Sequence, residues 1–438
     1  MHRFTGLIGV VFLGAVSSCT LVQWDSPLAW AQHWVNPDFE CHRLDMRDLG
    51  YPDVNEIPAN SSAITSLLAA RNGKIYGGTS GDDAYLFVYD PSINKVRHLG
   101  KIKGQQGIHH ALVEDSEGVI YIGTGIDMLH DVNLTRDFHA GPQSVLNSLW
   151  SDIKKPYEHY EGGHLYRFNP VPDVGQVAWH RHGEIFLPED PTPVEDLGIA
   201  VANNGIYALT IDSRAGTIYG VTYPDGHLFA YEIPQKKFRD LGELDHKLIF
   251  HGPERDWRSL PRALIVDDSG RVFTSGDDGL LVYYDPKSGK IQSTGMAIPG
   301  EYYPIQTYIG HPVVEYLAKD ETGLIYGGSS DGFLFSFNPS TLKVVNLGKP
   351  RISRRLRALA VGRDGRVYIV AGERIEPCRL FCFDPKEGGF RDLGVITVDR
   401  SPYYSWRGLQ FDSAAAGADG TIYLGESERR SHLFLYMP

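Results

Sequence analysis

The chain has 438 residues, of which 42% are hydrophobic and 22% are charged, and its formal net charge is -12. This composition is typical of a globular protein and not of a disordered chain, and the acidic balance argues against nucleic acid as a partner. The 24 Tyr and 48 Gly residues favour many short strands joined by tight turns.

The first 31 residues are predicted to be a signal peptide or a lipoprotein signal. Arg3 precedes a short apolar run from Leu7 to Val16, and about ten apolar residues are too few to span a bilayer as a helix. Two processing sites compete: Val16-Ser17-Ser18-Cys19 has the form of a bacterial lipobox with Cys19 lipidated, and Ala29-Trp30-Ala31 has the small-x-small pattern of signal peptidase cleavage. Both processing sites predict export from the cytoplasm. The protein would then be in the periplasm, secreted to the medium, or anchored to the outer membrane through lipid on Cys19.

Residues 32–438 are predicted to form one domain, because a single pattern recurs along them. A short strand ends in an acidic or Gly turn, and Gly, two further residues and an aromatic residue follow. The instances are Gly73-Lys74-Ile75-Tyr76, Gly118-Val119-Ile120-Tyr121, Gly216-Thr217-Ile218-Tyr219, Gly270-Arg271-Val272-Phe273, Gly323-Leu324-Ile325-Tyr326, Gly365-Arg366-Val367-Tyr368 and Gly420-Thr421-Ile422-Tyr423. An alternating strand follows each instance, and a fourth strand ends near Leu-Gly, as at Leu99-Gly100. Four antiparallel strands in each repeat of roughly 40 to 55 residues indicate the blades of a β-propeller.

The last repeat predicts how the ring closes. It stops at Pro438 after its third strand, whereas residues 45–50 near the N-terminus have the fourth-strand ending and no blade of their own. We therefore expect an all-β, seven-bladed propeller with four antiparallel strands per blade, closed by an N-terminal strand that removes the open edge. We also expect a monomer. Blade two carries a long insertion from Ile126 to about Gly163, and long loops in compact folds are usually functional or disordered.

The first strand of each blade lines the central channel, and aligning the repeats places one residue of each blade at the same height. These seven residues, all polar or ionisable, are Thr65, His110, Tyr207, Arg262, Glu315, Arg357 and Asp412. The positions that follow are mostly Ala or Leu, and a polar mouth above a small apolar neck is what a pocket at one face would show. A channel that only binds water is the competing interpretation of the ring.

Strand direction predicts which loops surround this ring. The connections that lead into the first strands are rich in aromatic and basic residues, among them Trp257, Tyr303, Trp406 and Arg407, and the blade-two insertion carries His130. We call this side the loop face. The opposite side, here the turn face, carries plain turns such as Asp115-Ser116-Glu117-Gly118. Ring, loops and insertion are therefore predicted to meet on the loop face.

At three positions the sequence resembles the seven-bladed propeller polysaccharide lyases, which include ulvan lyases and rhamnosyl-glucuronate lyases. The matching residues are His110 in Gly107-Ile108-His109-His110-Ala111-Leu112, His130 in Leu129-His130-Asp131, and Tyr207 in Gly205-Ile206-Tyr207-Ala208-Leu209. In that family a His opens the first strand of one blade, a second His lies about twenty residues on, and a Tyr opens the first strand of the next blade. One propeller relative in this group hydrolyses rhamnosides from the opposite face, so the fold alone does not decide the reaction.

The resemblance implies β-elimination on a uronic acid, without metal or cofactor. The site must neutralise the carboxylate, supply a base for the C5 proton and protonate or stabilise the leaving oxygen at C4. His110 and Tyr207 are the candidates for base and acid, and His130 would hold the carboxylate or the leaving sugar. A Tyr beside Arg262 is expected to have its phenolate favoured by the positive charge.

The sequence departs from the family pattern in one place. The family has an Arg about one strand after the Tyr, where this chain reads Gly220-Val221-Thr222-Tyr223. Either Arg262 or Arg357 takes that role, since a guanidinium suits carboxylate binding, or the carboxylate is bound differently. His109, Tyr223, Trp257, Tyr303, Trp406 and Arg407 complete the predicted substrate-binding set.

Two other functions remain open from the sequence. One is a non-catalytic exported propeller that binds a glycan or a protein, which the missing Arg favours. The other is a glycoside hydrolase, which needs two acids facing each other across the site, and the ring contains Glu315 and Asp412. The expected partner in the leading interpretation is an anionic polysaccharide or oligosaccharide.

Overall fold

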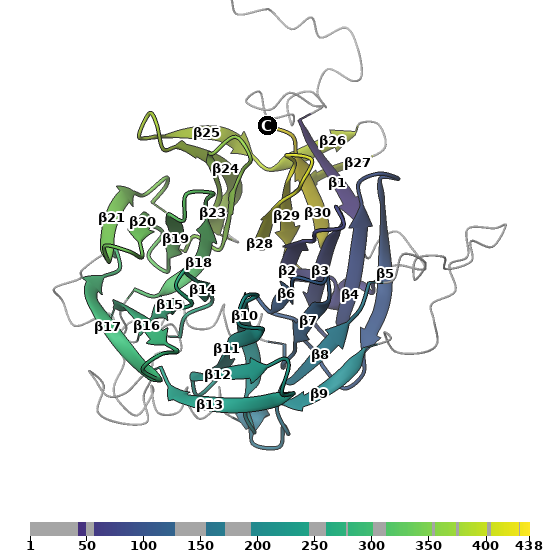
Figure 1. The fold of residues 1–438 in the computed structure, drawn as a ribbon. Coiled ribbons are helices and arrows are strands. Elements are labelled where there is room, and N and C mark those ends of the chain that lie inside the picture. Colours follow the sequence, from purple (N-terminus) through teal and green to yellow (C-terminus); the bar gives the residue numbers. More distant parts are fainter. Residues whose placement is uncertain are drawn as a thin grey trace, which may run out of the picture.

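Seven four-stranded antiparallel sheets are arranged radially around a central axis (Figure 1). The computed structural model describes residues 43–49, 57–127, 155–170, 194–244, 260–276, 279–300, 312–352, 355–373, 376–400, 404–428 and 430–438. The predicted seven-bladed propeller is thereby confirmed. None of the described helices has the length and apolar character needed to cross a membrane.

Each blade runs from an inner strand at the axis to an outer strand at the rim. Blade one contains β2 (Ala63–Ala69), β3 (Ile75–Ser80), β4 (Ala84–Asp90) and β5 (Lys95–Ile102). Blade two contains β6 (Leu112–Glu114), β7 (Ile120–Gly123), β8 (His164–Phe168) and β9 (Glu195–Ile199). Blade three contains β10 (Gly205–Asp212), β11 (Thr217–Tyr223), β12 (His227–Glu232) and β13 (Lys237–Glu243). Blade four contains β14 (Ile265–Val266), β15 (Val272–Ser275), β16 (Leu280–Asp285) and β17 (Lys290–Ala297).

The remaining blades follow the same order. Blade five contains β18 (Val314–Lys319), β19 (Ile325–Ser329), β20 (Leu334–Asn338) and β21 (Lys343–Gly348). Blade six contains β22 (Ala358–Val361), β23 (Val367–Glu373), β24 (Glu376–Asp384) and β25 (Gly389–Val395). Blade seven contains β28 (Phe411–Ala416), β29 (Ile422–Glu426), β30 (His432–Tyr436) and β1 (Leu44–Asp48). Outside the blades, the described residues also form a hairpin of β26 (Thr397–Arg400) and β27 (Tyr404–Arg407) and the 3-10 helices η2 (Ala59–Ser61) and η4 (Lys155–Tyr157).

The Leu-Gly ending of the fourth strands is a β-bulge. In β13 the pairing with β12 shifts at Leu241, and Gly242 takes a φ of 101°, a conformation that glycine adopts without steric cost. The Gly242 N–H donates to Asp240 Oδ1 at 2.9 Å. The same turn of backbone, closed by an Asp or Asn two residues before the Gly, recurs at Gly198, Gly348 and Gly394.

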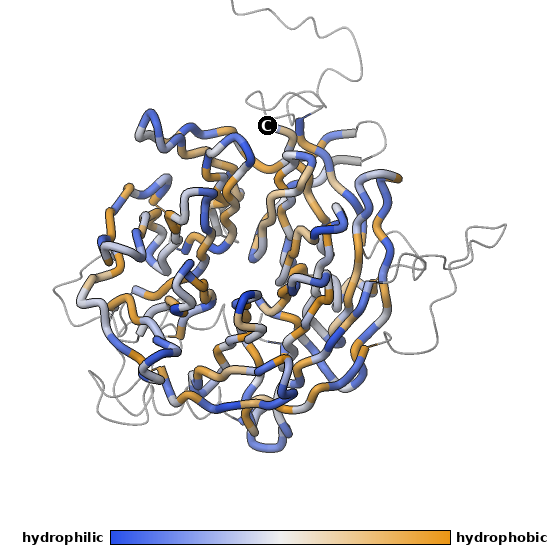
Figure 2. The backbone as a smooth tube through the Cα atoms, viewed as in Figure 1, coloured by the Kyte–Doolittle hydropathy of each residue, from blue (hydrophilic) through white to orange (hydrophobic). Residues whose placement is uncertain are grey.

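The core lies between neighbouring sheets, where hydrophobic side chains of adjacent blades pack in seven clusters. Hydrophobic stretches accordingly recur in every blade (Figure 2). The second strands carry glycine where a ring of the third strand crosses them: a Cβ at Gly77 would overlap Phe87, and one at Gly327 would overlap Phe335. These glycines allow the aromatic residues to fill the blade interior without a steric clash.

The N-terminal strand closes the ring as predicted. β1 pairs with β30 in antiparallel register, from Leu44 opposite Tyr436 to Asp48 opposite His432. His432 holds this junction, because its Nε2 lies 3.0 Å from Asp48 Oδ1 and its Nδ1 lies 2.9 Å from Glu426 Oε2. Burial lowers the pKa of His432, but hydrogen bonds to Asp48 and Glu426 outweigh burial and raise it overall.

We expect His432→Gln to lower the free energy of unfolding by about 1 to 3 kcal/mol, because buried Glu426 loses a charged partner. A raised folded-state pKa means that the His432 contribution is complete below its unfolded pKa and is lost as the pH rises through the folded pKa. Denaturant titrations of wild type and variant should therefore converge as the pH rises above about 6.5. The matched control is His227→Gln, which removes a half-buried pair with Asp240 on blade three and should cost less than about 1 kcal/mol. Equal losses in the two variants would contradict the assignment.

Candidate functional site

β-Bulges position four of the seven predicted ring residues. The pairing of first and second strands skips Thr65, Tyr207, Glu315 and Asp412, so each is the extra residue of a bulge in its inner strand. A bulge re-aims a side chain out of the regular alternation. His110, Arg262 and Arg357 lie just before the inner strands of their blades. Four of the seven predicted ring residues are therefore bulge residues, and the other three lie in the segments that lead into the inner strands.

A buried ionic network contains four of the seven ring residues. Arg355 binds Glu315 through two hydrogen bonds of 2.8 and 3.1 Å, and Arg357 Nη1 donates to Asp412 Oδ1 at 3.2 Å. Arg262 lies between the two carboxylates, with Nε 3.4 Å from Glu315 and Nη1 3.7 Å from Asp412. The Arg262 contacts are the longer ones, so this guanidinium is held less tightly by these two acids than Arg355 is.

The network keeps both carboxylates ionised. Burial raises the pKa of Asp412, but Arg357 and Arg262 outweigh burial and bring it well below its usual range. Burial likewise raises the pKa of Glu315, and Arg355 and Arg262 lower it overall. Burial beside two other arginines lowers the pKa of Arg355 to about 9. Glu315, Asp412 and Arg355 are thus charged at neutral pH, as is Arg262, whose pKa is raised.

His110, Tyr207 and Arg262 lie against one another. The His110 and Tyr207 rings have centroids 6.1 Å apart at 76°, and the Arg262 guanidinium lies 5.5 Å from the centroid of the Tyr207 ring. Burial and the Arg262 charge lower the pKa of His110 to about 3. Burial raises the pKa of Tyr207 to about 12, although Arg262 opposes this. Arg262 favours the phenolate as expected, but desolvation outweighs this charge, so the overall shift of the Tyr207 pKa is upward.

Two predicted substrate-binding residues pack around Tyr207. The rings of His109 and Tyr223 each have centroids 5.7 Å from that of Tyr207, and both side chains are buried. His109 Nε2 lies 2.8 Å from the Ile126 carbonyl oxygen. They support the Tyr207 ring and present little surface to a ligand.

The other predicted residues lie elsewhere or outside the described residues. Trp406, on β27, donates its indole N–H to Glu426 and packs its ring 4.4 Å from that of His432, so it belongs to the blade-seven closure and not to the His110 cluster. Arg407 lies beside it and is exposed. His130, Trp257 and Tyr303 lie outside the described residues, and their placement in the site stays a prediction.

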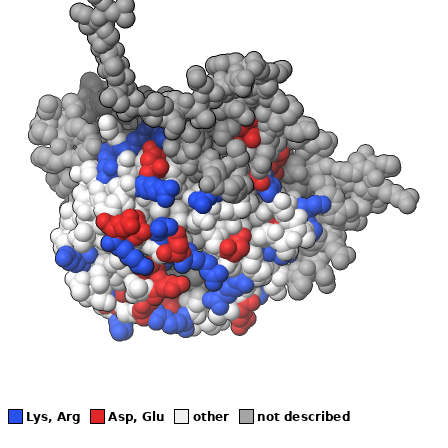
Figure 3. Space-filling view, turned by 90° about the horizontal axis from the view of Figure 1, so that it is seen from above, with Lys and Arg blue, Asp and Glu red and all other residues white. Residues whose placement is uncertain are grey.

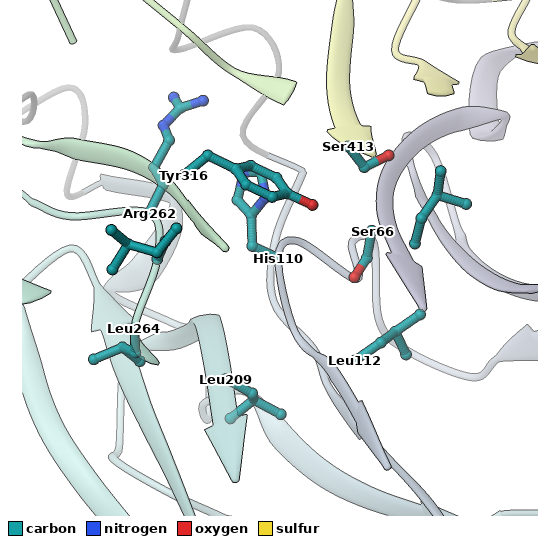
Figure 4. A pocket seen from close by; sticks show the side chains of 11 residues that line it. Ser66, His110, Leu112, Leu209, Arg262, Leu264, Tyr316 and Ser413 are labelled. Atoms are coloured by element: carbon teal, nitrogen blue, oxygen red, sulfur yellow. The ribbon is translucent and has the colours of Figure 1, made fainter. Parts of the chain in front are cut away.

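A cavity of about 130 Å³ lies in the channel next to this cluster (Figure 4). Its lining comes from the ring and from the next two positions of the inner strands: Ser66, Leu67, His110, Leu112, Leu209, Arg262, Ala263, Leu264, Tyr316, Leu317 and Ser413. Later positions in an inner strand lie nearer the turn face, so this cavity is on the turn-face side of the ring. The pocket predicted on the loop face involves segments outside the described residues.

Two residues of the cluster were missed by sequence reasoning. Arg355 is two positions before Arg357, outside the repeat register, and takes a left-handed φ of 66°. The run of basic residues that ends at Arg357 was the one sequence feature that could have indicated it. Tyr316 follows Glu315 and reaches into the channel. The sequence could have indicated Tyr316, since it is a large residue at a position where the other blades have Ser or Ala.

The described residues contain no group of three or more His, Cys, Asp or Glu side chains arranged to hold a metal ion. On the side of the ring seen in Figure 3, positive and negative side chains are interspersed over the described surface. The described surface also carries ion pairs that combine the two signs, such as Arg366–Asp384 and Arg379–Asp392. The concentration of buried arginine at the channel is thus a local feature of the site.

The comparisons with known proteins bear on the fold. No protein-family model matches the sequence, and no curated protein matches it. Among solved structures, the chain is similar to a streptogramin B lyase, with a TM-score of 0.57 and 9% identity, over 92% of this chain and 99% of that one. A catalytically inactive virginiamycin B lyase from Staphylococcus aureus, solved with quinupristin, gives a TM-score of 0.55 and 10% identity over 90% of this chain and 100% of that one.

A third similar structure is the extracellular domain of the two component system protein BT4673 from B. thetaiotaomicron. It gives a TM-score of 0.50 and 15% identity over 89% of this chain, which spans 39% of that longer chain. Identities of this order establish a shared architecture only. The neighbours therefore share the propeller architecture of this chain, and they are two lyases and the extracellular domain of a two component system.

Proposed function

We propose that the protein is an exported polysaccharide lyase that cleaves a uronic-acid-containing glycan, of the rhamnose-glucuronate type, by β-elimination without a metal. The observation that carries the proposal is the contact of His110, Tyr207 and Arg262 at the channel. Export is supported by the predicted signal in residues 1–31 and by the extracellular neighbour.

Protonation states assign the two proton-transfer roles. With a pKa of about 3, His110 is neutral at pH 7 and can accept a proton, and with a pKa of about 12, Tyr207 is protonated and can donate one. His110 would take the C5 proton, the C5–H electron pair would form the C4=C5 double bond, and the C4–O bond would break. The leaving oxygen would take the Tyr207 proton, and proton exchange with solvent would restore both residues.

The substrate carboxylate would raise the basicity of His110. In the unliganded protein the Arg262 charge is the largest charge effect that lowers the His110 pKa. A uronate carboxylate bound at Arg262 would offset that charge, so His110 would become a stronger base when substrate is present. Arg262 is the better candidate than Arg357 for this role, because it contacts the Tyr207 ring and its two ion pairs are the longer ones.

The hydrolase alternative fits the charges poorly. A retaining or inverting hydrolase needs one protonated carboxyl group as its acid, and both Glu315 and Asp412 have lowered pKa values. A non-catalytic binding propeller is favoured by one observation, the burial of Tyr207 and Arg262, each 4% exposed. The lyase, the hydrolase and the binding propeller predict different outcomes in a single assay.

We expect the purified protein to release unsaturated uronate ends from ulvan, gum arabic or another uronate glycan, seen as a rise in ultraviolet absorbance. A chelator should leave the rate unchanged. Reducing-end release without the absorbance rise would indicate hydrolysis. Binding to a glycan column without either signal would support the binding propeller.

A further inference from the structure

A large side chain crosses the channel beside His110 and has no part in the mechanism proposed above. Tyr316 lies on β18 directly after the bulged residue Glu315. The corresponding positions in the other blades are small: Ser66, Ala111, Ala208, Ala263, Ala358 and Ser413. These small residues leave the space at the axis that the Tyr316 ring occupies in Figure 4.

The hydroxyl group of Tyr316 is anchored on a different blade. It donates to the Ala414 carbonyl oxygen at 2.6 Å and accepts from the Ala414 N–H at 3.3 Å. Tyr316 belongs to blade five and Ala414 to the inner strand of blade seven. The ring is therefore held at both ends, which restricts its rotation about the side-chain bonds.

The Tyr316 ring contacts the proposed base. Its centroid lies 6.1 Å from that of His110, with an interplanar angle of 88°, so His110 lies between the rings of Tyr316 and Tyr207. Among the described residues, no hydrogen bond to a ring nitrogen of His110 is formed. The two edge-to-face ring contacts favour one orientation of the imidazole.

We propose that Tyr316 is a positioning residue, which holds the His110 imidazole in one orientation and limits its contact with the turn-face cavity that both residues line. The catalytic meaning of this role rests on the proposed lyase function. The structural role concerns His110 itself and is open to test without any substrate.

The environment of His110 makes the removal of the Tyr316 ring measurable as a change in the His110 pKa. The titratable and charged groups around it are Arg262, Asp412, His109, Glu315, Tyr207 and Tyr316. Burial is the largest cause of its low pKa, and removal of the Tyr316 ring would enlarge the cavity that both residues line and bring more water to the imidazole. Hydration favours the charged form, so the pKa should rise.

The test follows the Cε1–H resonance of His110 by NMR between pH 4 and pH 8, with the resonance assigned from the His110→Gln spectrum. We expect no titration of His110 in this range in the wild type or in Tyr316→Phe, which keeps the ring. In Tyr316→Ala we expect His110 to titrate within the range, toward the ordinary His value of about 6.5. If Tyr316→Ala does not fold, Tyr316→Leu removes the ring with a smaller loss of volume.

Tyr368→Leu is the control, since Tyr368 is a buried ring in blade six whose hydroxyl donates to Asp364. It should destabilise the protein without changing the titration of His110. A His110 titration unchanged in folded Tyr316→Ala or Tyr316→Leu would overturn the proposal. On a glycan that the wild type cleaves, Tyr316→Ala should lower kcat by about 10²-fold with a smaller change in KM, and Tyr316→Phe should restore most of it. If no glycan is cleaved, the lyase function fails, and the titration still decides the role of Tyr316.

Discussion

Tyr207→Phe is expected to lower the turnover of a uronate glycan by about 10² to 10⁴-fold, the usual range for loss of a general acid or base. The substitution removes the phenolic proton that would protonate the leaving oxygen, and it keeps the ring that packs against His109, His110 and Tyr223. The Tyr207 hydroxyl forms no hydrogen bond with another described residue, so the melting temperature should change little.

The matched control for this experiment is Tyr219→Phe. Tyr219 lies in the same hydrophobic cluster as Tyr207 and is equally buried, at 4% exposure, but it does not contact His110. Its loss of a hydroxyl should leave turnover within about threefold of the wild type. His110→Ala should lower turnover as strongly as Tyr207→Phe. Full activity in both Tyr207→Phe and His110→Ala would exclude this cluster as the catalytic site.

Repeat register predicts the fold well because each blade repeats the same local rules. The Gly-x-x-aromatic turn, the alternating third strand and the Leu-Gly ending each specify a strand or a bulge from a few neighbouring residues. The Leu-Gly ending illustrates this, since Asp240 closes the Gly242 bulge by a contact only two residues away. The N-terminal strand could be assigned for the same reason, because Asp48-Leu49-Gly50 is the missing ending of blade seven.

The site is less predictable because its contacts join different blades. Register placed His110, Tyr207, Arg262, Glu315, Arg357 and Asp412 at one height, but which of them pair depends on the exact path of each bulge. Arg355 could not be found in this way, since it enters the network through a left-handed backbone conformation outside the repeat. Trp406 was grouped with the site from its loop, whereas the β26–β27 hairpin directs its indole to Glu426.

The protonation states of the site residues were the property that the sequence predicted least well. The sequence gives the neighbours of Tyr207 but not its burial, and burial exceeds the effect of Arg262 on its pKa. The same holds for His110, whose low pKa follows first from burial and only then from charge. Burial at the axis depends on the side chains of several blades together, so it becomes known only with the assembled ring.

Asp412→Asn is expected to lower the free energy of unfolding by about 3 to 5 kcal/mol, because it removes the charge that compensates Arg262 and Arg357 at a buried site. The amide keeps the size of the side chain and can still contact Ser427, which donates to Asp412 Oδ2 at 2.6 Å. The loss should therefore come from charge and not from packing. Urea denaturation at pH 7 measures it.

The pH dependence distinguishes this cause from a packing defect. Because the folded-state pKa of Asp412 is lowered, its contribution is present above the unfolded value of about 3.9 and is lost as the pH falls toward the folded value. The difference between wild type and Asp412→Asn should therefore be largest at neutral pH and shrink below about pH 4. The control is Lys101→Met, which breaks the exposed Lys101–Asp83 pair of 3.2 Å and should cost less than about 1 kcal/mol. If Asp412→Asn lowers the free energy of unfolding as little as the control does, the positive charges of Arg262 and Arg357 are balanced by groups other than Asp412.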